Sequence, residues 1–411
     1  MKSNNLAFNK IEIEEIEIGM SVSYSQTITD KDIKQFAEIS GDYNPIHLDE
    51  EYAKKSRFKK RIAHGMMTAS YFSALFGTKI PGEGCVYTSQ NLKFKKPVYI
   101  GDIVTAIVEV TNVDLSKRKV LFKTTCTVND KIVTYGESEL YVPIEFRKIM
   151  INDKNELLQY KEQIFELFSN CFSQDIDEDL WYWEYIENPN GNPIISLYFY
   201  DNKLVGHYSV IPIKLIMEKN KSILGALSMT TMVDISYRKY GIFIDQANEV
   251  YEKSIELGYK FVFGFPNKKS APGFKKRLDW ILEENLYVAK LTKNELLILS
   301  SQNNSDKIGF NSLDIDNLEW RLNKPNQKYI KNDKNILKQF NNEFDNEFDI
   351  VFDSDNYSSL DSDKKYNILL DRDLDKFIDK KEFDYIFGYR LFDDNLKNIN
   401  FKKDLILSDV F

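Results

Sequence analysis

The chain has 411 residues, of which 43% are hydrophobic, and a formal net charge of -8 at pH 7. This length predicts two or three domains with their own hydrophobic cores, and the acidic balance argues against a protein that binds nucleic acid through its phosphates. No apolar run reaches the roughly 18 residues of a membrane helix and the first residues lack the pattern of a secretory signal, so we expect a cytoplasmic protein with no membrane partner.

The first 145 residues have the pattern of an antiparallel sheet around a helix. A capped helix is predicted over residues 29–40. Segment 64–77, HGMMTASYFSALFG, is small or apolar on every side, which is typical of a helix enclosed all round. Runs rich in Val, Ile, Thr and Tyr with period-two alternation follow at 101–113, 118–128 and 131–143. We therefore predict an α+β domain over residues 1–145, in which a long antiparallel sheet wraps one buried helix.

The remainder, residues 150–411, has a different organisation. It begins with a helical pattern over 154–172 and an aromatic loop over 180–192. From about residue 286 onward Asn, Asp and Lys are frequent, but Phe and Ile recur too often for a purely solvated segment. We therefore expect a folded extension over 286–411 that ends in the strand-like DLILSDVF.

The middle of this second region has the order strand, strand, strand, helix, strand. Two strands flank a turn at residues 201–203, and a third strand ends near Asp234. A helix over 241–258 leads to a buried strand that begins at Tyr259. Because crossovers between parallel strands are right-handed, the last two strands are predicted to be parallel neighbours in an α/β domain.

The first motif with chemical meaning is GDYNPIHLDE, residues 41–50. Asp42 and His47 are five residues apart and are held by the rigid Asn44-Pro45 turn, so both side chains can converge on one water molecule. The spacing alone is equally consistent with an Asp42 that caps a helix and a structural histidine at position 47.

This motif and its surroundings, over roughly residues 18–143, resemble the MaoC-like (R)-specific enoyl-CoA hydratases of the hotdog fold. The segments 41–77 and 91–102 carry the resemblance. It implies that a trans-2-enoyl-CoA is hydrated to an (R)-3-hydroxyacyl-CoA and that hotdog domains pair into a homodimer. The residues that the resemblance implies are the catalytic Asp42 and His47, and the oxyanion- or substrate-binding Asn44, Gly65 and Ser73.

The chemistry of hydration agrees with these assignments. Negative charge gathers on the thioester oxygen when water adds to the β-carbon, and unpaired N–H groups at the start of the helix near Gly65 can stabilise it. We expect His64 to brace the turn before this helix. The basic stretch RFKKR at 57–61 is predicted to be a solvated turn, or else a contact for the phosphates of a nucleotide cofactor.

A second motif lies at residues 238–241, where R-x-x-G follows a strand and a helix begins. Several N–H groups of such a turn point outward together and can hold a pyrophosphate. Strand, R-x-x-G, helix and the strand FVFGF resemble the acetyl-CoA-binding core of the GNAT superfamily of N-acyltransferases, over about residues 167–280. The acyl-CoA-binding residues that this resemblance implies are Val233, Arg238, Lys239, Tyr240, Gly241, Ile242, Phe243 and Asn267.

Two positions depart from the GNAT pattern. Phe243 stands where a small residue is usual, and Phe274 stands about where a tyrosine often protonates the leaving thiolate, so Tyr287 or solvent would have to serve. We predict His207 or Asp234 as the base that acts on the amine, with a buried structural histidine as the alternative for His207. The acceptor-binding residues that we predict on the aromatic loop are Trp183, Asn188 and Asn190, although aromatic residues at such spacing are commonly core.

Both regions point to thioesters of coenzyme A as substrates. The widely spaced Cys85, Cys126 and Cys171 favour buried thiols, and no metal is expected. We predict a bifunctional enzyme that hydrates crotonyl-CoA or a near relative and transfers the 3-hydroxyacyl group to an amine. By analogy, the amine belongs to a dTDP- or UDP-linked amino sugar. The alternative is an active hydratase whose GNAT-like region only binds acyl-CoA or acts as a scaffold.

Overall fold

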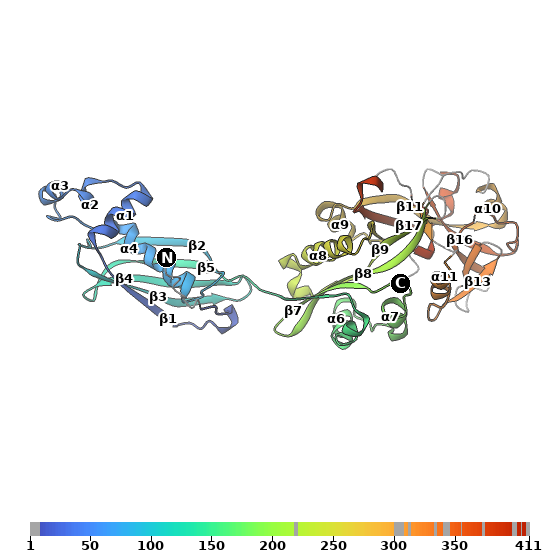
Figure 1. Ribbon diagram of the computed structural model, residues 1–411, viewed down its shortest axis with the longest axis horizontal. Helices are drawn as coiled ribbons and strands as arrows, with labels where there is room; N and C mark the ends of the chain where they lie inside the picture. Colours follow the sequence, from blue (N-terminus) through green and yellow to red (C-terminus); the bar gives the residue numbers. More distant parts are fainter. Residues whose placement is uncertain are drawn as a thin grey trace. The chain divides into compact units, whose positions relative to one another are not determined.

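The chain divides into two compact units between Glu145 and Phe146, called unit 1 and unit 2 below (Figure 1). The structure is a computed structural model. It describes residues 9–217, 221–299, 308–310, 314–332, 335–339, 346–354, 356–371, 375–396, 401–403 and 405–407. Within these ranges, no helix is long and apolar enough to cross a membrane.

Unit 1 is a five-stranded antiparallel sheet in the order β1-β3-β4-β5-β2, with helix α4 packed against it (Figure 1). Its strands are β1 (Ser21–Thr27), β2 (Val86–Phe94), β3 (Ile103–Asp114), β4 (Lys119–Val128) and β5 (Lys131–Tyr141). Its α-helices are α1 (Asp30–Ser40), α2 (Pro45–Leu48), α3 (Glu50–Lys55) and α4 (Gly65–Thr78). The alternation along β3 and β4 turns every second residue toward α4. The predicted meander and helix are confirmed.

One prediction about α4 is wrong for this unit, because the helix is not enclosed on every side. Met67, Phe72 and Phe76 are buried against the sheet. The opposite stripe is exposed and consists of Met66, Ser70, Ser73, Ala74 and Gly77. A helix of small and apolar residues therefore leaves one face uncovered.

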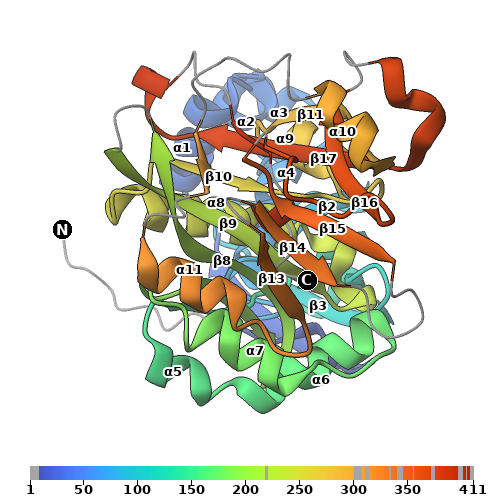
Figure 2. The same cartoon turned by 90° about the vertical axis from the view of Figure 1, so that its right-hand side faces the viewer.

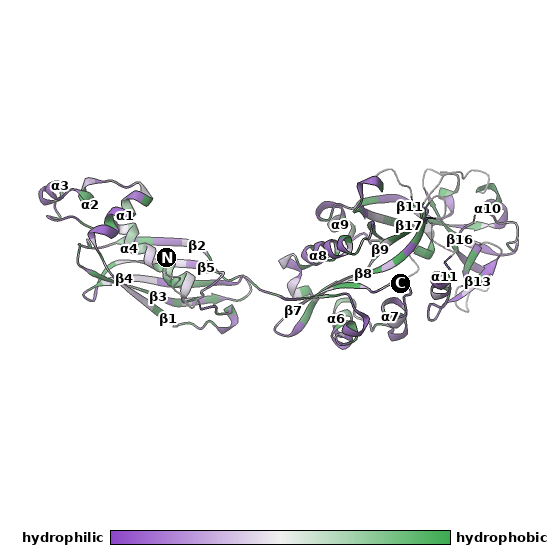
Figure 3. Cartoon of the chain, in the orientation of Figure 1, coloured by the Kyte–Doolittle hydropathy of each residue, from purple (hydrophilic) through white to green (hydrophobic). Residues whose placement is uncertain are grey.

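Unit 2 is a larger mixed sheet in the order β13-β14-β15-β16-β11-β17-β10-β9-β8-β7-β6, with β12 paired to β8. Its first strands are β6 (Arg147–Ile151), β7 (Ile194–Tyr200), β8 (Lys203–Met217), β9 (Lys221–Val233) and β10 (Phe261–Gly264). Asp201 and Asn202 take left-handed conformations in the tight β7–β8 turn, and β9 pairs with β10 in parallel, as predicted. Hydrophobic residues in the buried run along β8 colour part of this strand green in Figure 3.

Helices cover both faces of this sheet. Helix α8 (Ile242–Glu256) packs against Tyr208 and Val210 of β8, while α6 (Lys161–Phe172) packs against the face that carries Ile211 and Ile213 (Figure 1). The predicted helix over 154–172 is in fact two helices, α5 (Lys154–Leu158) and α6.

The first part of the predicted aromatic loop is helix α7 (Glu178–Tyr185). The side chain of Asp177 accepts a hydrogen bond from the backbone of Leu180 and caps this helix, a start signal that the aromatic composition obscured.

The C-terminal extension is folded in the described residues, but it is not simply appended to the core. Strand β17 (Lys381–Leu391) inserts between β10 and β11 (Ile281–Thr292), so the sheet is completed by residues far along the chain. The segment between β11 and β17 adds β13 to β16 side by side at the edge of the sheet (Figure 2). Its elements are α10 (Lys293–Leu299), β12 (Gly309–Phe310), α11 (Ile315–Leu322), β13 (Lys328–Asn332), β14 (Asn335–Gln339), β15 (Glu347–Phe352) and β16 (Lys365–Asp371), and α9 (Ala271–Arg277) comes just before β11. Leu405–Leu407 forms a 3-10 turn rather than the predicted strand, and the rest of DLILSDVF lies outside the described residues.

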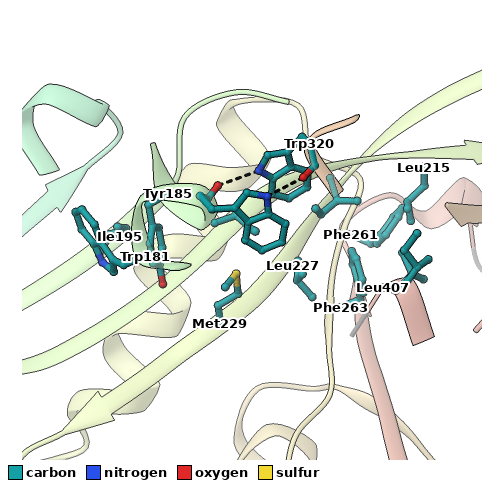
Figure 4. Close-up of a cluster of buried hydrophobic side chains, with 14 of the residues drawn as sticks. Trp181, Tyr185, Ile195, Leu215, Leu227, Met229, Phe261, Phe263, Trp320 and Leu407 are labelled. Atoms are coloured by element: carbon teal, nitrogen blue, oxygen red, sulfur yellow. Dashed lines mark hydrogen bonds between the residues drawn. The ribbon is translucent and has the colours of Figure 1, made fainter. Parts of the chain in front are cut away.

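Helix α11 is fixed to α7 by a pair of tryptophans. The rings of Trp183 and Trp320 stack with centroids 4.7 Å apart. The indole of Trp183 donates to the carbonyl of Trp320 at 2.7 Å and that of Trp320 donates to the carbonyl of Trp183 at 2.9 Å (Figure 4). This reciprocal contact ties the inserted segment to the first helices of unit 2.

Replacing Trp320 by alanine is expected to destabilise unit 2 by about 3–5 kcal/mol, because it removes a buried ring and leaves a carbonyl without its donor. All four tryptophans, at positions 181, 183, 280 and 320, lie in unit 2, so their fluorescence during urea unfolding follows this unit. Phe383→Ala, at a side chain 53% exposed, is the control. Equal midpoints for the two variants would contradict the proposed importance of the tryptophan pair.

Candidate active sites

The loop that carries Asp42 and His47 is built by consecutive caps. Helix α1 ends at Gly41, whose φ of 74° is left-handed and suits glycine. The side chain of Asn44 accepts a hydrogen bond from the backbone two residues later at 3.2 Å, and Pro45 opens α2. Asn44, predicted to bind substrate, therefore has its side-chain oxygen engaged in the cap that orients His47.

Asp42, His47 and His64 lie together in unit 1. Nδ1 of His47 donates to the carbonyl of Ile62 at 2.8 Å, which leaves Nε2 for proton exchange, and this nitrogen lies 3.9 Å from Oδ2 of Asp42. Nε2 of His64 donates to the backbone oxygen of Asp42 at 2.9 Å. The two imidazole centroids are 3.8 Å apart. Nε2 of His64 also lies 3.9 Å from Oδ2 of Asp42, so both rings are near the carboxylate, but His64 is bound to the backbone of Asp42 and only His47 has its Nε2 free of such a bond.

The surroundings keep His47 neutral at physiological pH. Burial lowers its pKa below the ordinary value, the hydrogen bond to Ile62 opposes this shift, and the nearby His64 adds to it. The side chain of Asp42 is 51% exposed and its Oδ1 accepts a hydrogen bond from the backbone of Asn44. A neutral imidazole and a carboxylate that water can reach therefore face each other, which is the arrangement that two-way proton transfer needs.

Gly65 is the first residue of α4, directly after His64. A Cβ at this position would lie 2.8 Å from the ring of Phe94, so the close approach of strand β2 suits glycine. The first N–H groups of a helix have no partner within it and can hold a developing negative charge. Ser73 lies two turns further along α4, on its exposed stripe.

Asp42, His47 and His64 each place a ligand-type atom within 4.8 Å of the others, which is a spacing that could hold a metal ion. The hydration chemistry predicted from the sequence would use a carboxylate and an imidazole directly and would require no metal. The basic stretch at 57–61 does not act as one patch, because Arg61 forms ion pairs with Asp30 and Glu50.

The second site is a cavity of about 920 Å³ in unit 2. Strands β9 and β10 pair at Ala226 and Leu227, and later residues of β9, namely 228–231 and Val233, line the cavity instead. Gly241 and Phe243 line it on the α8 side, and α6 and α7 line it on the other. Since these helices cover opposite faces of the sheet, the cavity passes through the gap between β9 and β10.

Most residues of the predicted acyl-CoA site meet at this cavity. Val233, Arg238, Gly241, Phe243 and Asn267 line it, whereas Lys239, Tyr240 and Ile242 do not. The 3-10 helix η3 (Ile235–Tyr240) ends at Gly241, whose φ of 77° turns the chain into α8 and presents the start of that helix to the cavity.

Two further contacts fix the edges of this site. Nε of Arg238 donates to the carbonyl of Val233 at 3.1 Å. The side-chain oxygen of Asn267 accepts from the backbone of Lys269 and Ser270 and so holds the turn before α9. Both predicted ligand-binding residues therefore also shape the cavity wall.

The two departures from the GNAT pattern contact each other. The rings of Phe243 and Phe274 pack edge to face with centroids 5.1 Å apart, and Phe274 packs on Trp280 at 4.5 Å. A Cβ at Gly273 would lie 3.1 Å from Phe243. The two rings thus form one aromatic part of the cavity wall, at the positions where the GNAT pattern has a small residue and a tyrosine. Tyr287 is fully buried in a separate core cluster and does not line the cavity.

Neither predicted base lines the cavity. His207 is fully buried, its Nδ1 donates to the carbonyl of Thr230 at 2.7 Å, and burial lowers its pKa to about 4. Burial raises the pKa of Asp234, but the ion pair with Lys203 at 2.9 Å and the hydrogen bond from Ser236 together hold it below its ordinary value. Both groups therefore make structural contacts and do not line the cavity themselves, although Thr230, which binds His207, does.

The predicted acceptor-binding residues also lie elsewhere. Trp183 stacks on Trp320, Asn188 donates to the carbonyl of Pro212, and Asn190 donates to Asn188 and Asn317. These are core contacts, a correction that follows from the helical conformation of the segment. The side chains of this segment that line the cavity are Asp177, Leu180, Trp181 and Glu184. Their spacing is one face of a helix, a pattern that a helical interpretation of the sequence would have found.

Comparisons with known proteins match each of the two regions to a known domain. Residues 14–132 match the model of the MaoC-like domain, and residues 158–282 match that of an acetyltransferase (GNAT) domain. The chain is 51% identical to the (R)-specific enoyl-CoA hydratase of Rhodospirillum rubrum over 130 residues, which are 32% of this chain and 90% of that protein.

Two further proteins that resemble this chain are also named as hydratases or dehydratases. The 3-hydroxybutyryl-CoA dehydratase of Methylorubrum extorquens is 45% identical over 32% of this chain and 83% of its own length. A solved structure, the (R)-hydratase from A. caviae involved in PHA biosynthesis, is 37% identical and covers 32% of this chain and 99% of its own, with a TM-score of 0.31.

The predicted fold class and the predicted use of coenzyme A thioesters are thereby confirmed. The chain belongs to the MaoC-like family of (R)-specific enoyl-CoA hydratases over residues 14–132 and carries a GNAT acetyltransferase domain over residues 158–282, so it is an enzyme.

Proposed function

We propose that the chain hydrates a trans-2-enoyl-CoA, crotonyl-CoA or a near relative, in unit 1 and transfers the resulting (R)-3-hydroxyacyl group to an amine in unit 2. The observation that carries this proposal is that one chain holds two separate sites suited to acyl thioesters. One is the Asp42–His47 pair beside the start of α4, and the other is the cavity at the start of α8.

The proposed course of hydration uses the Asp42–His47 pair and the start of α4. A water molecule held between Oδ2 of Asp42 and Nε2 of His47 loses a proton to one of them as its oxygen adds to the β-carbon. The thioester oxygen gathers the negative charge, which the N–H groups near Gly65 stabilise. The member that took this proton then returns it to the α-carbon, so that the carboxylate and the neutral imidazole are both restored at the end of each cycle.

We further propose that unit 1 forms a homodimer through its uncovered surface. Strand β2 is an edge of the sheet, and its Val86, Tyr87 and Phe94 are 50%, 37% and 52% exposed. The exposed stripe of α4 adds Met66, and α4 packs beside β2. An apolar edge strand next to an uncovered helix face supports pairing with a second copy.

In unit 2, the cavity through the sheet supports transfer. The start of α8 and Arg238 would hold the pyrophosphate of the acyl-CoA, and the thioester would lie in the gap between β9 and β10, where an amine can reach it. The amino group of a dTDP- or UDP-linked amino sugar is our proposed acceptor, by analogy with related chemistry. The cytoplasm, where acyl-CoA is available, is the proposed location.

A second function is favoured by one observation. Both predicted bases make structural contacts without lining the cavity, and Phe274 cannot donate a proton, as expected if unit 2 only binds acyl-CoA. Incubating the protein with crotonyl-CoA and a panel of amines that includes a dTDP-amino sugar separates the two. Free coenzyme A that appears only when an amine is present supports transfer, whereas hydration without that release supports binding alone.

Asp42→Asn is expected to lower kcat/KM for crotonyl-CoA hydration by about 10²–10⁴-fold, because the pair then lacks one of its two proton carriers. Transfer from preformed (R)-3-hydroxybutyryl-CoA should be unchanged in this variant. The control is Glu51→Gln, at an exposed carboxylate of the neighbouring α3. Loss of the enoyl thioester absorbance measures the rate, and normal hydration by the Asp42→Asn variant would refute the site.

The pH profile of hydration tests the state of His47. Its pKa is lowered from 6.5, so the neutral form that accepts a proton persists below that pH and is lost only as the pH falls through the lowered value. The acidic limb of kcat/KM should therefore have its midpoint below 6.5. Because the chain has three histidines, NMR titration can follow each ring directly. A midpoint above 6.5 for His47 would exclude this assignment.

Gly241→Ala is expected to raise KM for acyl-CoA in the transfer assay at least about tenfold, since alanine resists the left-handed conformation that presents the start of α8. Gly258→Ala is a matched control. Gly258 follows the end of the same helix, its φ is +85°, and a Cβ there meets nothing within 4 Å, as at Gly241. Equal effects of the two substitutions on KM would show a loss of stability rather than of acyl-CoA binding.

A further inference from the structure

Helix α7 places a buried carboxylate at the wall of the unit 2 cavity. Glu184 lines this cavity and is only 4% exposed. Among the described residues, no hydrogen bond or ion pair engages its carboxylate. Charged groups do act on it from the same helix, through Asp177, and from the inserted segment, through Arg321 and Lys324. A buried acid that faces a cavity without a hydrogen-bonding partner is costly unless a ligand supplies one.

The two cations near Glu184 are directed to other contacts. Arg321 donates to the backbone oxygen of Ile406 and lies over the ring of Trp183, with 5.2 Å between the guanidinium carbon and the ring centroid. The ammonium of Lys324 lies 5.8 Å from the centroid of the same ring. Neither of these side chains lines the cavity. Both cations therefore act on the carboxylate of Glu184 electrostatically without lining the cavity, so the cavity side of this carboxylate is left for a ligand.

The cavity has ends of opposite charge. Its lysine and arginine residues are Arg238, Lys269 and Arg277, all from η3 and the region of α9 beside the proposed acyl-CoA site. The end formed by α7 and the residues before it carries instead Asp175, Asp177 and Glu184, with the apolar Phe168, Phe172 and Trp181. Such an end attracts a cation and repels a phosphate.

We propose that the acceptor's amino group enters the α7 end of the cavity as an ammonium ion, that Glu184 binds it and takes its proton, and that no phosphate of the acceptor enters with it. This inference rests on the proposed transfer reaction and specifies its acceptor: a primary amine whose entering part is uncharged apart from the ammonium group. In a nucleotide-linked acceptor, the diphosphate would remain outside the cavity.

The transfer step is balanced as follows. The ammonium gives one proton to the carboxylate of Glu184, and the free amine attacks the thioester carbonyl. A carbon–nitrogen bond forms, the carbon–sulfur bond breaks, and the second proton lost by the nitrogen goes to the leaving thiolate. The products are an amide and coenzyme A, and Glu184 releases its proton to solvent.

Burial raises the pKa of Glu184 well above its ordinary value, against the opposing pull of Lys324 and Arg321, while Asp177 adds to the rise. A carboxyl with a raised pKa is a stronger base, and it is protonated and inactive below that pKa. The kcat/KM for the amine should therefore rise with pH through the titration of this group.

The test compares Glu184→Gln with Asp179→Asn, a control at an exposed acid of the same helix that does not line the cavity. We expect Glu184→Gln to raise KM for the amine at least about tenfold, to lower kcat and to remove the acidic limb of its pH profile. The KM for acyl-CoA and hydration by unit 1 should not change. Glu184→Asp should keep the pH-dependent limb. An amine KM and pH profile like those of the wild type in Glu184→Gln would overturn the inference.

A comparison on the unaltered protein is independent of how the variants fold. Glucosamine is expected to be a better acceptor than glucosamine 6-phosphate by at least about tenfold in kcat/KM, and a quaternary ammonium compound should compete with the amine but not with acyl-CoA. A preference for the phosphorylated sugar would refute the inference while leaving transfer intact. If no amine in a wider panel releases coenzyme A, transfer itself is wrong and this acceptor site fails with it.

Discussion

Both proposed sites depend on the same constraint, which is that one helix must begin against a sheet with its first N–H groups unpaired within the helix. In each unit a glycine stands at that point. At Gly65 a Cβ would lie 2.8 Å from the ring of Phe94, which would have to shift, and at Gly241 the backbone is left-handed. The two glycines are needed for different reasons, one steric and one conformational, but each lets a loop turn directly into the start of a long helix, α4 or α8.

In unit 2 this constraint is combined with a gap in the sheet. Strands β9 and β10 pair over only two residue pairs and then part, so part of β9 faces a cavity instead of another strand. Such a gap would weaken the sheet if β10 were its edge. Strand β17 lies on the other side of β10 and pairs with all four residues of β10, from Phe261 to Gly264. The late part of the chain therefore supports the opening that the earlier part creates.

The sequence predicted the elements whose causes are local. The D-x-N-P-x-H loop was identified because each residue acts within a few positions: Gly41 ends one helix, Asn44 caps the next, and His47 faces back to Asp42. The β7–β8 turn and the parallel pairing of β9 and β10 followed in the same way from short-range signals and from the handedness of crossovers.

The errors of prediction have long-range causes. Aromatic residues at 181–185 resembled a loop because composition outweighed the single capping residue Asp177, and this hid Trp181 and Glu184 on one helical face. His207 looked chemically suited to act as a base, but its burial depends on the packing of α6 and α7 against β8. The place of β17 between β10 and β11 depends on pairing across the inserted segment, for which no local pattern exists.

The order of the two proposed reactions also has a thermodynamic reason. Addition of water to an enoyl thioester is reversible, and a catalyst lowers the barrier of both directions, so the proposed Asp42–His47 pair would also catalyse the loss of water. Transfer of the acyl group from sulfur to nitrogen exchanges a reactive thioester for a stable amide. If unit 2 carries out the proposed transfer, it removes the hydrated product, and the reversible hydration in unit 1 is then drawn toward hydroxyacyl groups.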